Sequence, residues 1–146
     1  MARNARIVRA SPERIFAVLG DGWLYPAWVV GASRIRAVDA SWPAEGASLH
    51  HSFGSWPLLL NDSTSVIAWD APRRVVMRPR GWPLLGEAQV TLTVRPDRGG
   101  SLVRIEEHPV RGPGRLVPRW IMDAFVFARN RETLRRLAYL AEGAAR

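Results

Sequence analysis

The spacing of apolar residues changes along the chain and divides it into parts of different structure. Between residues 33 and 109 apolar and polar residues alternate, which predicts strands with one buried face. The alternating segments are 33–40, 48–54, 62–69, 73–79, 87–96 and 101–109, and a shorter one covers 6–10. The pattern therefore predicts a sheet of seven strands.

Turn-forming residues separate these segments, as in 70–73 (DAPR) and 96–100 (PDRGG). Turns of this length connect antiparallel strands. In the clearest segment Val90, Leu92 and Val94 share one face, and threonines occupy the other. We therefore expect antiparallel hairpins with one apolar face.

Two short helices are predicted between the first two strands. Residues 11–20 (SPERIFAVLG) begin with Ser11 as an N-cap and Pro12 in the first turn, and they end at Gly20. The next stretch, 19–31, is interrupted by glycines and a proline, so it predicts a second short helix or a turn.

From about residue 115 the helical period returns and predicts one long C-terminal helix, with a bend near Pro118. The stripe predicted to face the sheet consists of Leu116, Trp120, Phe127, Leu134, Ala138 and Ala141. Asp123 and Asn130 fall within that stripe, although buried polar groups cost free energy unless they are paired.

The order of these elements indicates an α+β protein with a single domain, residues 1–146. An antiparallel sheet needs one face covered, and only the C-terminal helix is long enough to cross it. A curved sheet wrapped around that helix leaves a space between them, and the two short helices would close one end of it.

Composition narrows the classes of function. The net charge is +8, and all basic residues are arginines spread over the whole chain, so we expect no nucleic acid partner. Cysteine is absent, and no signal segment or apolar span of about 20 residues is evident, so we expect a cytoplasmic protein without stable membrane insertion. The three histidines lack metal-ligand spacing, and no cofactor motif is present.

Three segments resemble the START-type helix-grip (SRPBCC) superfamily: ASPERIFAVLGD after a short strand, the turn WDAPRRVVMR, and the ending RNRETLRRLAYLAEG. That group includes polyketide cyclase/dehydrase-like proteins, lipid-transfer domains and the birch-pollen allergens. The resemblance covers nearly the whole chain and implies a helix-grip fold with a deep apolar cavity. It carries no catalytic residue over to this chain, because the superfamily has no shared catalytic set.

The aromatic residues between the glycines are the first candidates for ligand contact. Trp23 and Trp28 would lie at the cavity mouth, where amphipathic rings can meet a ligand, whereas Tyr25 could equally face water. The alternative is that these rings only fill the gap between the sheet and the helix.

Two strands offer titratable candidates. His51 shares a face with Phe53, so both are predicted to point inward, and Glu107 shares a face with Ile105. A carboxylate in an apolar pocket has a raised pKa and can act as an acid or a base. The alternatives are a hydrogen-bonded core histidine and, because Pro109 follows closely, a glutamate at the solvated rim.

On the C-terminal helix, Asp123, Phe127 and Asn130 are candidates for ligand contact, and the amide of Asn130 can both donate and accept. The alternative is pairing within the protein, with Arg78 or Arg104 as candidate partners, although alternation turns Arg104 outward.

The leading hypothesis is a protein that binds a hydrophobic small molecule, lipid or polyketide-like, without catalysis. The competing hypothesis is a polyketide aromatase/cyclase in which His51, Glu107 or Asn130 assists proton transfer. A hydrogen bond between His51 and Glu107 in the cavity would favour the enzyme. A third hypothesis is a regulatory or partner-binding domain, with Ile121, Phe125 and Leu140 as a surface for a homodimer.

Overall fold

Seven antiparallel strands form one sheet in the computed structural model, which describes residues 2–53, 60–80, 87–110 and 118–143. The strands are β1 (Ala2–Val8), β2 (Ala32–Val38), β3 (Ser48–Phe53), β4 (Leu60–Asp70), β5 (Arg74–Pro79), β6 (Ala88–Asp97) and β7 (Gly100–Pro109). Their order across the sheet is β1-β7-β6-β5-β4-β3-β2, so the first two strands of the chain form its two edges. The predicted fold class is confirmed.

The helices also follow the predicted order. They are α1 (Pro12–Leu19), the 3-10 helix η1 (Gly22–Leu24), α2 (Tyr25–Trp28) and α4 (Arg119–Gly143). The α1 helix has the predicted cap, because the Ser11 hydroxyl accepts a hydrogen bond from the backbone N–H of Arg14 at 3.3 Å. Ile15 and Phe16 on its inner side are buried in the core.

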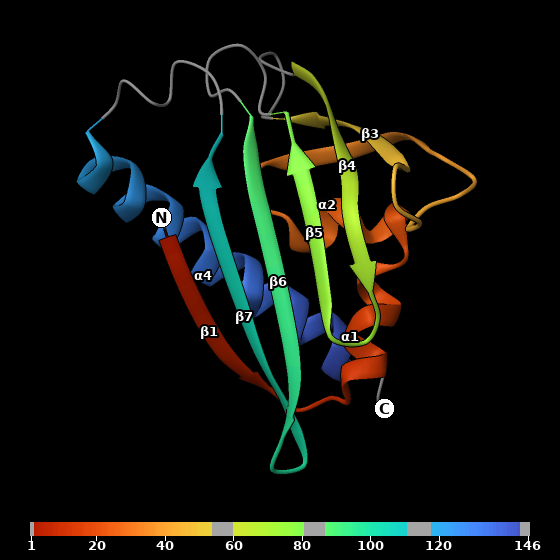
Figure 1. Cartoon of the computed structure of the whole chain (residues 1–146), viewed down its shortest axis with the longest axis vertical. Coiled ribbons are helices and arrows are strands. Elements are labelled where there is room, and N and C mark those ends of the chain that lie inside the picture. The colour runs from red at the N-terminus through yellow and green to blue at the C-terminus, as the bar shows by residue number, and fades with distance from the viewer. Residues whose placement is uncertain (1, 54–59, 81–86, 111–117, 144–146) are drawn as a thin grey trace.

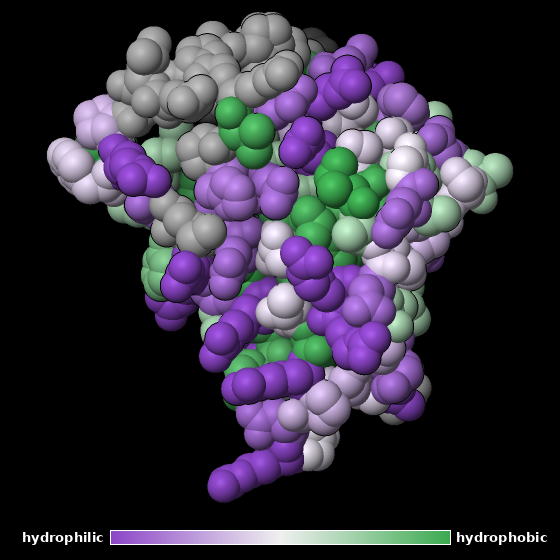
Figure 2. Space-filling view, viewed as in Figure 1, coloured by the Kyte–Doolittle hydropathy of each residue, from purple (hydrophilic) through white to green (hydrophobic). Residues whose placement is uncertain are grey.

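The helices lie together behind the sheet, with α4 crossing it obliquely (Figure 1). The core lies between these two layers, where Leu92 of β6 and Val103 and Ile105 of β7 belong to one cluster with Leu134 and Leu137 of α4. The opposite face of the sheet is largely hydrophilic, with scattered apolar residues (Figure 2).

The predicted inward stripe of α4 is correct only in the second half of the helix. Leu134, Ala138 and Ala141 are buried, but Trp120 is 75% exposed and Phe127 is 49% exposed. The first turn of α4, which includes Trp120, extends beyond the edge strand β1 (Figure 1). Phe127 lies beside β1, where its backbone carbonyl is hydrogen-bonded to Asn4, but its side chain remains half exposed. Leu116 lies outside the described residues, and α4 begins at Arg119, directly after Pro118 rather than being bent there.

Candidate functional site

The aromatic stretch between the glycines turns two of its three rings into the core. Tyr25 and Trp28 are three residues apart on α2, so they share one side of that helix, and both are buried. Their rings meet edge to face, with centroids 5.4 Å apart. Trp23 lies on η1 with its side chain mostly in solvent, so only Trp28 of the two predicted tryptophans borders the interior.

The hydroxyl of Thr64 joins Tyr25 and His51 in one buried hydrogen-bonded chain. Its Oγ1 atom lies 2.9 Å from Tyr25 Oη and 3.1 Å from His51 Nε2. The three side chains come from α2, β4 and β3, and the His51 and Tyr25 rings lie with centroids 5.0 Å apart. Because Thr64 has one hydroxyl proton, it donates to at most one of these partners, and the tautomer of His51 decides the direction of the bond to Nε2.

Burial keeps both end groups of this chain neutral at pH 7. It raises the pKa of Tyr25 to about 12, against the smaller opposing effects of the Thr64 hydrogen bond and the charge of Arg129. It lowers the pKa of His51 from 6.5, although the nearby carboxylate of Asp62 acts in the other direction. The chain is therefore a set of neutral donors and acceptors that can exchange the direction of their hydrogen bonds.

An ion pair joins the last strand to the long helix. Nη2 of Arg129 donates to Oε1 of Glu107 at 3.3 Å, and the glutamate is buried while the arginine is 20% exposed. Glu107 therefore points inward, as predicted, with a counter-charge supplied by α4. No hydrogen bond joins Glu107 to His51 among the residues that the structure describes.

Asn130 stands in the interior with its amide unpaired. The residue is fully buried, and neither Oδ1 nor Nδ2 has a hydrogen-bond partner within the described part of the chain. The indole Nε1 of Trp28 is also buried and without a partner there. Unpaired buried polar groups each cost roughly 1–3 kcal/mol, so these atoms mark a place suited to a polar group that is not part of the chain.

The remaining predicted site residues differ in position. Phe127 is half exposed, and its backbone carbonyl accepts a hydrogen bond from Asn4 Nδ2 at 3.1 Å. Asp123 is half-buried and takes part in an interaction within the protein. Phe53 ends β3, and its side chain lies outside what the structure describes.

Thr64, Arg129 and the inward position of Tyr25 were missed by the sequence analysis. The spacing of Tyr25 from Trp28 was a usable signal, because residues three apart on a helix face the same way. Thr64 alternates with exposed or half-buried residues in the same register as Asp62 and Val66. The alternation therefore also indicated that Thr64 faces the interior. Nothing in the sequence pairs Arg129 with Glu107.

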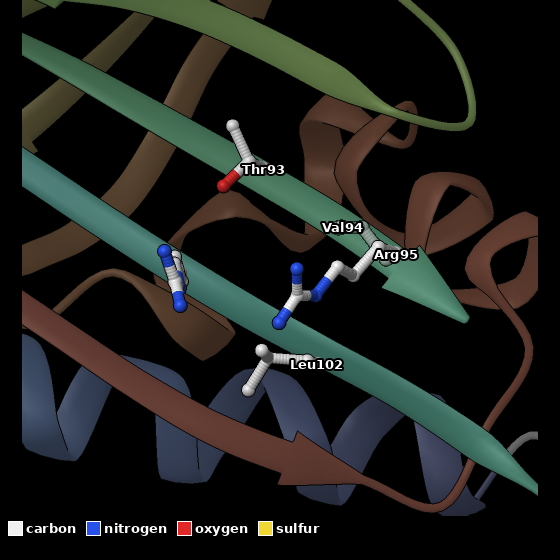
Figure 3. A pocket seen from close by; sticks show the side chains of 5 residues that line it. Thr93, Val94, Arg95 and Leu102 are labelled. Atoms are coloured by element: carbon white, nitrogen blue, oxygen red, sulfur yellow. The ribbon is translucent and has the colours of Figure 1, made fainter. Parts of the chain in front are cut away.

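A hollow of about 160 Å³ lies on the other face of the sheet, between β6 and β7 (Figure 3). It is lined by Thr93, Val94, Arg95, Leu102 and Arg104. Thr93 pairs with Arg104 and Arg95 with Leu102, and both arginines are exposed, so Arg104 faces outward as predicted. This basic hollow is separated from the interior cluster by the sheet itself.

The described ranges contain no group of three or more His, Cys, Asp or Glu residues placed to hold a metal ion. None of the helices in those ranges is long and apolar enough to cross a membrane.

The helix-grip class is defined by a seven-stranded antiparallel sheet, a long C-terminal helix and short helices after the first strand, all of which the described residues contain. Residues 2–142 match the model of the family described as polyketide cyclase / dehydrase and lipid transport. The chain belongs to that family. No curated protein matches its sequence.

Solved structures share the fold at low sequence identity. A Rhodobacter sphaeroides protein is 20% identical with a TM-score of 0.74, over 97% of this chain and 91% of that one. A Staphylococcus aureus protein of unknown function is 11% identical with a TM-score of 0.75, over 99% and 94%. The di-domain ARO/CYC StfQ from the steffimycin biosynthetic pathway is 14% identical with a TM-score of 0.73, over 98% and 50%.

Proposed function

We propose that the protein binds a hydrophobic small molecule, a lipid or polyketide-like compound, between the sheet and α4. The observation that carries the proposal is the fully buried, unpaired amide of Asn130. A ligand with an oxygen-bearing end, such as a carbonyl or hydroxyl group, would satisfy the amide, and Trp28 Nε1 is a second buried donor without a partner in the described residues. The apolar remainder of the ligand would lie among the surrounding core residues.

Family membership supports a hydrophobic ligand, since the family is described by polyketide cyclisation or dehydration and by lipid transport. No hydrogen bond joins His51 to Glu107 in the described residues, which favours binding over the form of the cyclase hypothesis in which these two residues act together. His51 is engaged by Thr64 and Glu107 by Arg129, so each has a partner within the fold.

A cyclase that uses the same interior is the second candidate function. It is favoured by the neutral chain from Tyr25 through Thr64 to His51, which could move a proton to or from a bound carbonyl compound. The similarity in fold to StfQ is consistent with this candidate. The conversion of a poly-β-ketone probe by the wild type, with loss on changing Tyr25 to Phe, would establish it.

Native mass spectrometry of gently purified protein tests the binding proposal. We expect a reproducible added mass that is released on denaturation and has the mass of a hydrophobic compound. The variant Asn130→Leu should lose that mass and be at least as stable as the wild type, because the change removes an unpaired buried amide.

The matched control is Thr133→Val, on the same buried side of α4 one turn further along. Thr133 Oγ1 accepts a hydrogen bond from the backbone N–H of Val30 at 3.4 Å, so its loss affects stability without removing the unpaired amide. This variant should keep the added mass. A spectrum without added mass, repeated after incubation with a panel of lipids and polyketides, would contradict the proposal.

A further inference from the structure

The first three turns of α4 expose apolar side chains along one side of the helix. Exposed residues on that side are Trp120, Ile121, Ala124, Phe125 and Ala128, which together we call the α4 apolar face. Trp120, Ile121 and Phe125 are 75%, 43% and 60% exposed. Surface helices normally turn such a face to the core, and a continuous exposed apolar patch indicates a binding partner.

The described parts of the fold contact α4 on its other side. Val126, Asn130 and Leu134 are buried there, one turn apart, where α4 contacts α1, α2, β1 and β7. The α4 apolar face begins on the turns that extend beyond β1 (Figure 1) and continues to the turn that contacts β1, where the Phe127 carbonyl accepts a hydrogen bond from Asn4. The first turns that carry it therefore project from the body of the protein.

Positive charge borders the α4 apolar face. Arg119 precedes Trp120, and the same side of the helix continues after Ala128 with the exposed residues Arg131 and Arg135. Glu132 is shared between Arg135 and Arg136, so this half of the helix keeps an excess of positive charge. The whole chain has a net charge of +8.

This positive charge distinguishes between two partners for the α4 apolar face, a second copy of the chain and a lipid surface. In a two-fold dimer the same face meets itself, so the arginines of both copies would approach one another and repel. An anionic lipid surface attracts these arginines and at the same time accepts the apolar side chains between them. Tryptophan is particularly suited to the boundary between headgroups and acyl chains.

We propose that the α4 apolar face docks onto an anionic lipid bilayer. Trp120 and Phe125 enter the boundary between headgroups and acyl chains, while Arg131 and Arg135 contact lipid phosphates. The helix lies on the surface rather than crossing the bilayer, in keeping with its polarity. The proposal does not depend on a ligand in the interior.

Flotation with lipid vesicles tests this proposal on the full chain. We expect the wild type to float with vesicles of phosphatidylcholine and phosphatidylglycerol, and at least tenfold less with phosphatidylcholine alone. Trp120→Ser/Phe125→Ser should lower the partition coefficient on the anionic vesicles by more than tenfold. Both side chains are exposed, so circular dichroism and the Tm should match the wild type.

Two variants serve as controls. Ile67→Ser removes an apolar side chain that is 43% exposed on β4 rather than on α4, and should keep vesicle binding. Arg95→Gln/Arg104→Gln removes two charges from the outer hollow of the sheet (Figure 3) and should weaken binding far less than the apolar variant.

The proposal is overturned if the wild type does not float, or if Trp120→Ser/Phe125→Ser floats as well as the wild type. It is also overturned if the Arg95 and Arg104 changes alone abolish flotation, because the sheet face would then be the docking surface. A dimer in sedimentation that the apolar variant converts to a monomer, without vesicle binding, would make the face a subunit interface. Asn130→Leu should leave flotation unchanged, which separates this result from the ligand experiment.

Discussion

His51 is the interior residue whose protonation links the cluster to the stability of the fold. Its ring is almost fully buried and contacts the Thr64 hydroxyl, and burial lowers its pKa below 6.5. In the unfolded chain the same ring binds a proton as the pH falls through about 6.5, whereas in the folded chain it remains neutral to a lower pH. Acidification therefore favours the unfolded state.

We predict that protonation of His51 has no effect on the free energy of unfolding above about pH 7. Below pH 6.5 the free energy of unfolding should fall as the pH is lowered. The contribution of this one group has a slope of up to about 1.4 kcal/mol per pH unit, until the pH reaches the pKa of the folded state. Urea unfolding of the wild type and His51→Gln at pH 7.5 and 5.5 measures it. His50→Gln, which changes a partly exposed ring, should follow the wild type, and equal pH dependence in all three proteins would contradict the prediction.

Glu107 and Arg129 form an interior pair of opposite charges, whereas the arginines of the Asp70–Arg73 and Glu132–Arg135 pairs are mostly exposed. Changing Glu107 to Gln leaves the Arg129 charge largely buried, so the free energy of unfolding should fall by about 2 kcal/mol. This is less than the roughly 3–5 kcal/mol of a wholly buried pair, because Arg129 is 20% exposed.

The double variant Glu107→Leu/Arg129→Met separates the contribution of the two charges to stability from the contribution of side-chain packing. Because it removes both charges, its stability in urea unfolding should lie closer to the wild type than that of Glu107→Gln. Asp70→Asn, in an exposed pair with Arg73, should change stability very little. A double variant less stable than Glu107→Gln would show that the pair itself stabilises the fold.

At the scale of single elements, β7 begins where it passes very close to the end of β1. A Cβ atom at Gly100 would lie 2.3 Å from the backbone carbonyl oxygen of Val8, which is much too close. We predict that Gly100→Ala lowers the free energy of unfolding by about 2 kcal/mol, because the strands must separate to admit the methyl group. Gly143→Ala has open space around its Cβ and should be neutral or slightly stabilising.

Thermal unfolding of these two glycine variants is the measurement. A Tm for Gly100→Ala equal to that of Gly143→Ala would mean that the β1–β7 pairing can move apart without loss.

The elements that sequence analysis predicted well are those whose signal is local. Alternation defined the strands, and the Ser11 cap followed by proline defined α1, because these patterns act within a few residues. The first strand was predicted at 6–10 but runs over Ala2–Val8. Its N-terminal half is held by pairing with β7, from Ala2 with Glu107 to Val8 with Ser101, which its own residues do not reveal.

The candidate site was predictable only one side chain at a time. Alternation correctly turned His51 and Glu107 inward, and helical spacing placed Asn130 on the buried side of α4. Their partners Thr64 and Arg129 are set by the approach of separate elements, which a sequence pattern does not contain. The exposure of Trp120 depends on how far α4 extends beyond the sheet, which is also a property of the assembled fold.

At the scale of the whole molecule, the interior and the α4 apolar face lie on consecutive turns of one helix. Asn130, Arg129 and Glu107 belong to the interior, and Ala128 ends the apolar face two residues before Asn130. If both proposals hold, a membrane-bound molecule would hold its ligand site within one or two helical turns of the lipid. A hydrophobic ligand could then pass between the two without crossing much water.

The strand order also determines when the protein can finish folding. β1 pairs only with β7 in the described sheet, and Ala2 and Glu107 are more than a hundred residues apart in the chain. During synthesis, the strands from β2 to β6 can pair in turn as they leave the ribosome, but β1 must wait until β7 has been made. Contacts of such sequence separation slow folding. The N-terminal strand, the first to be synthesised, is thus among the last to enter the sheet.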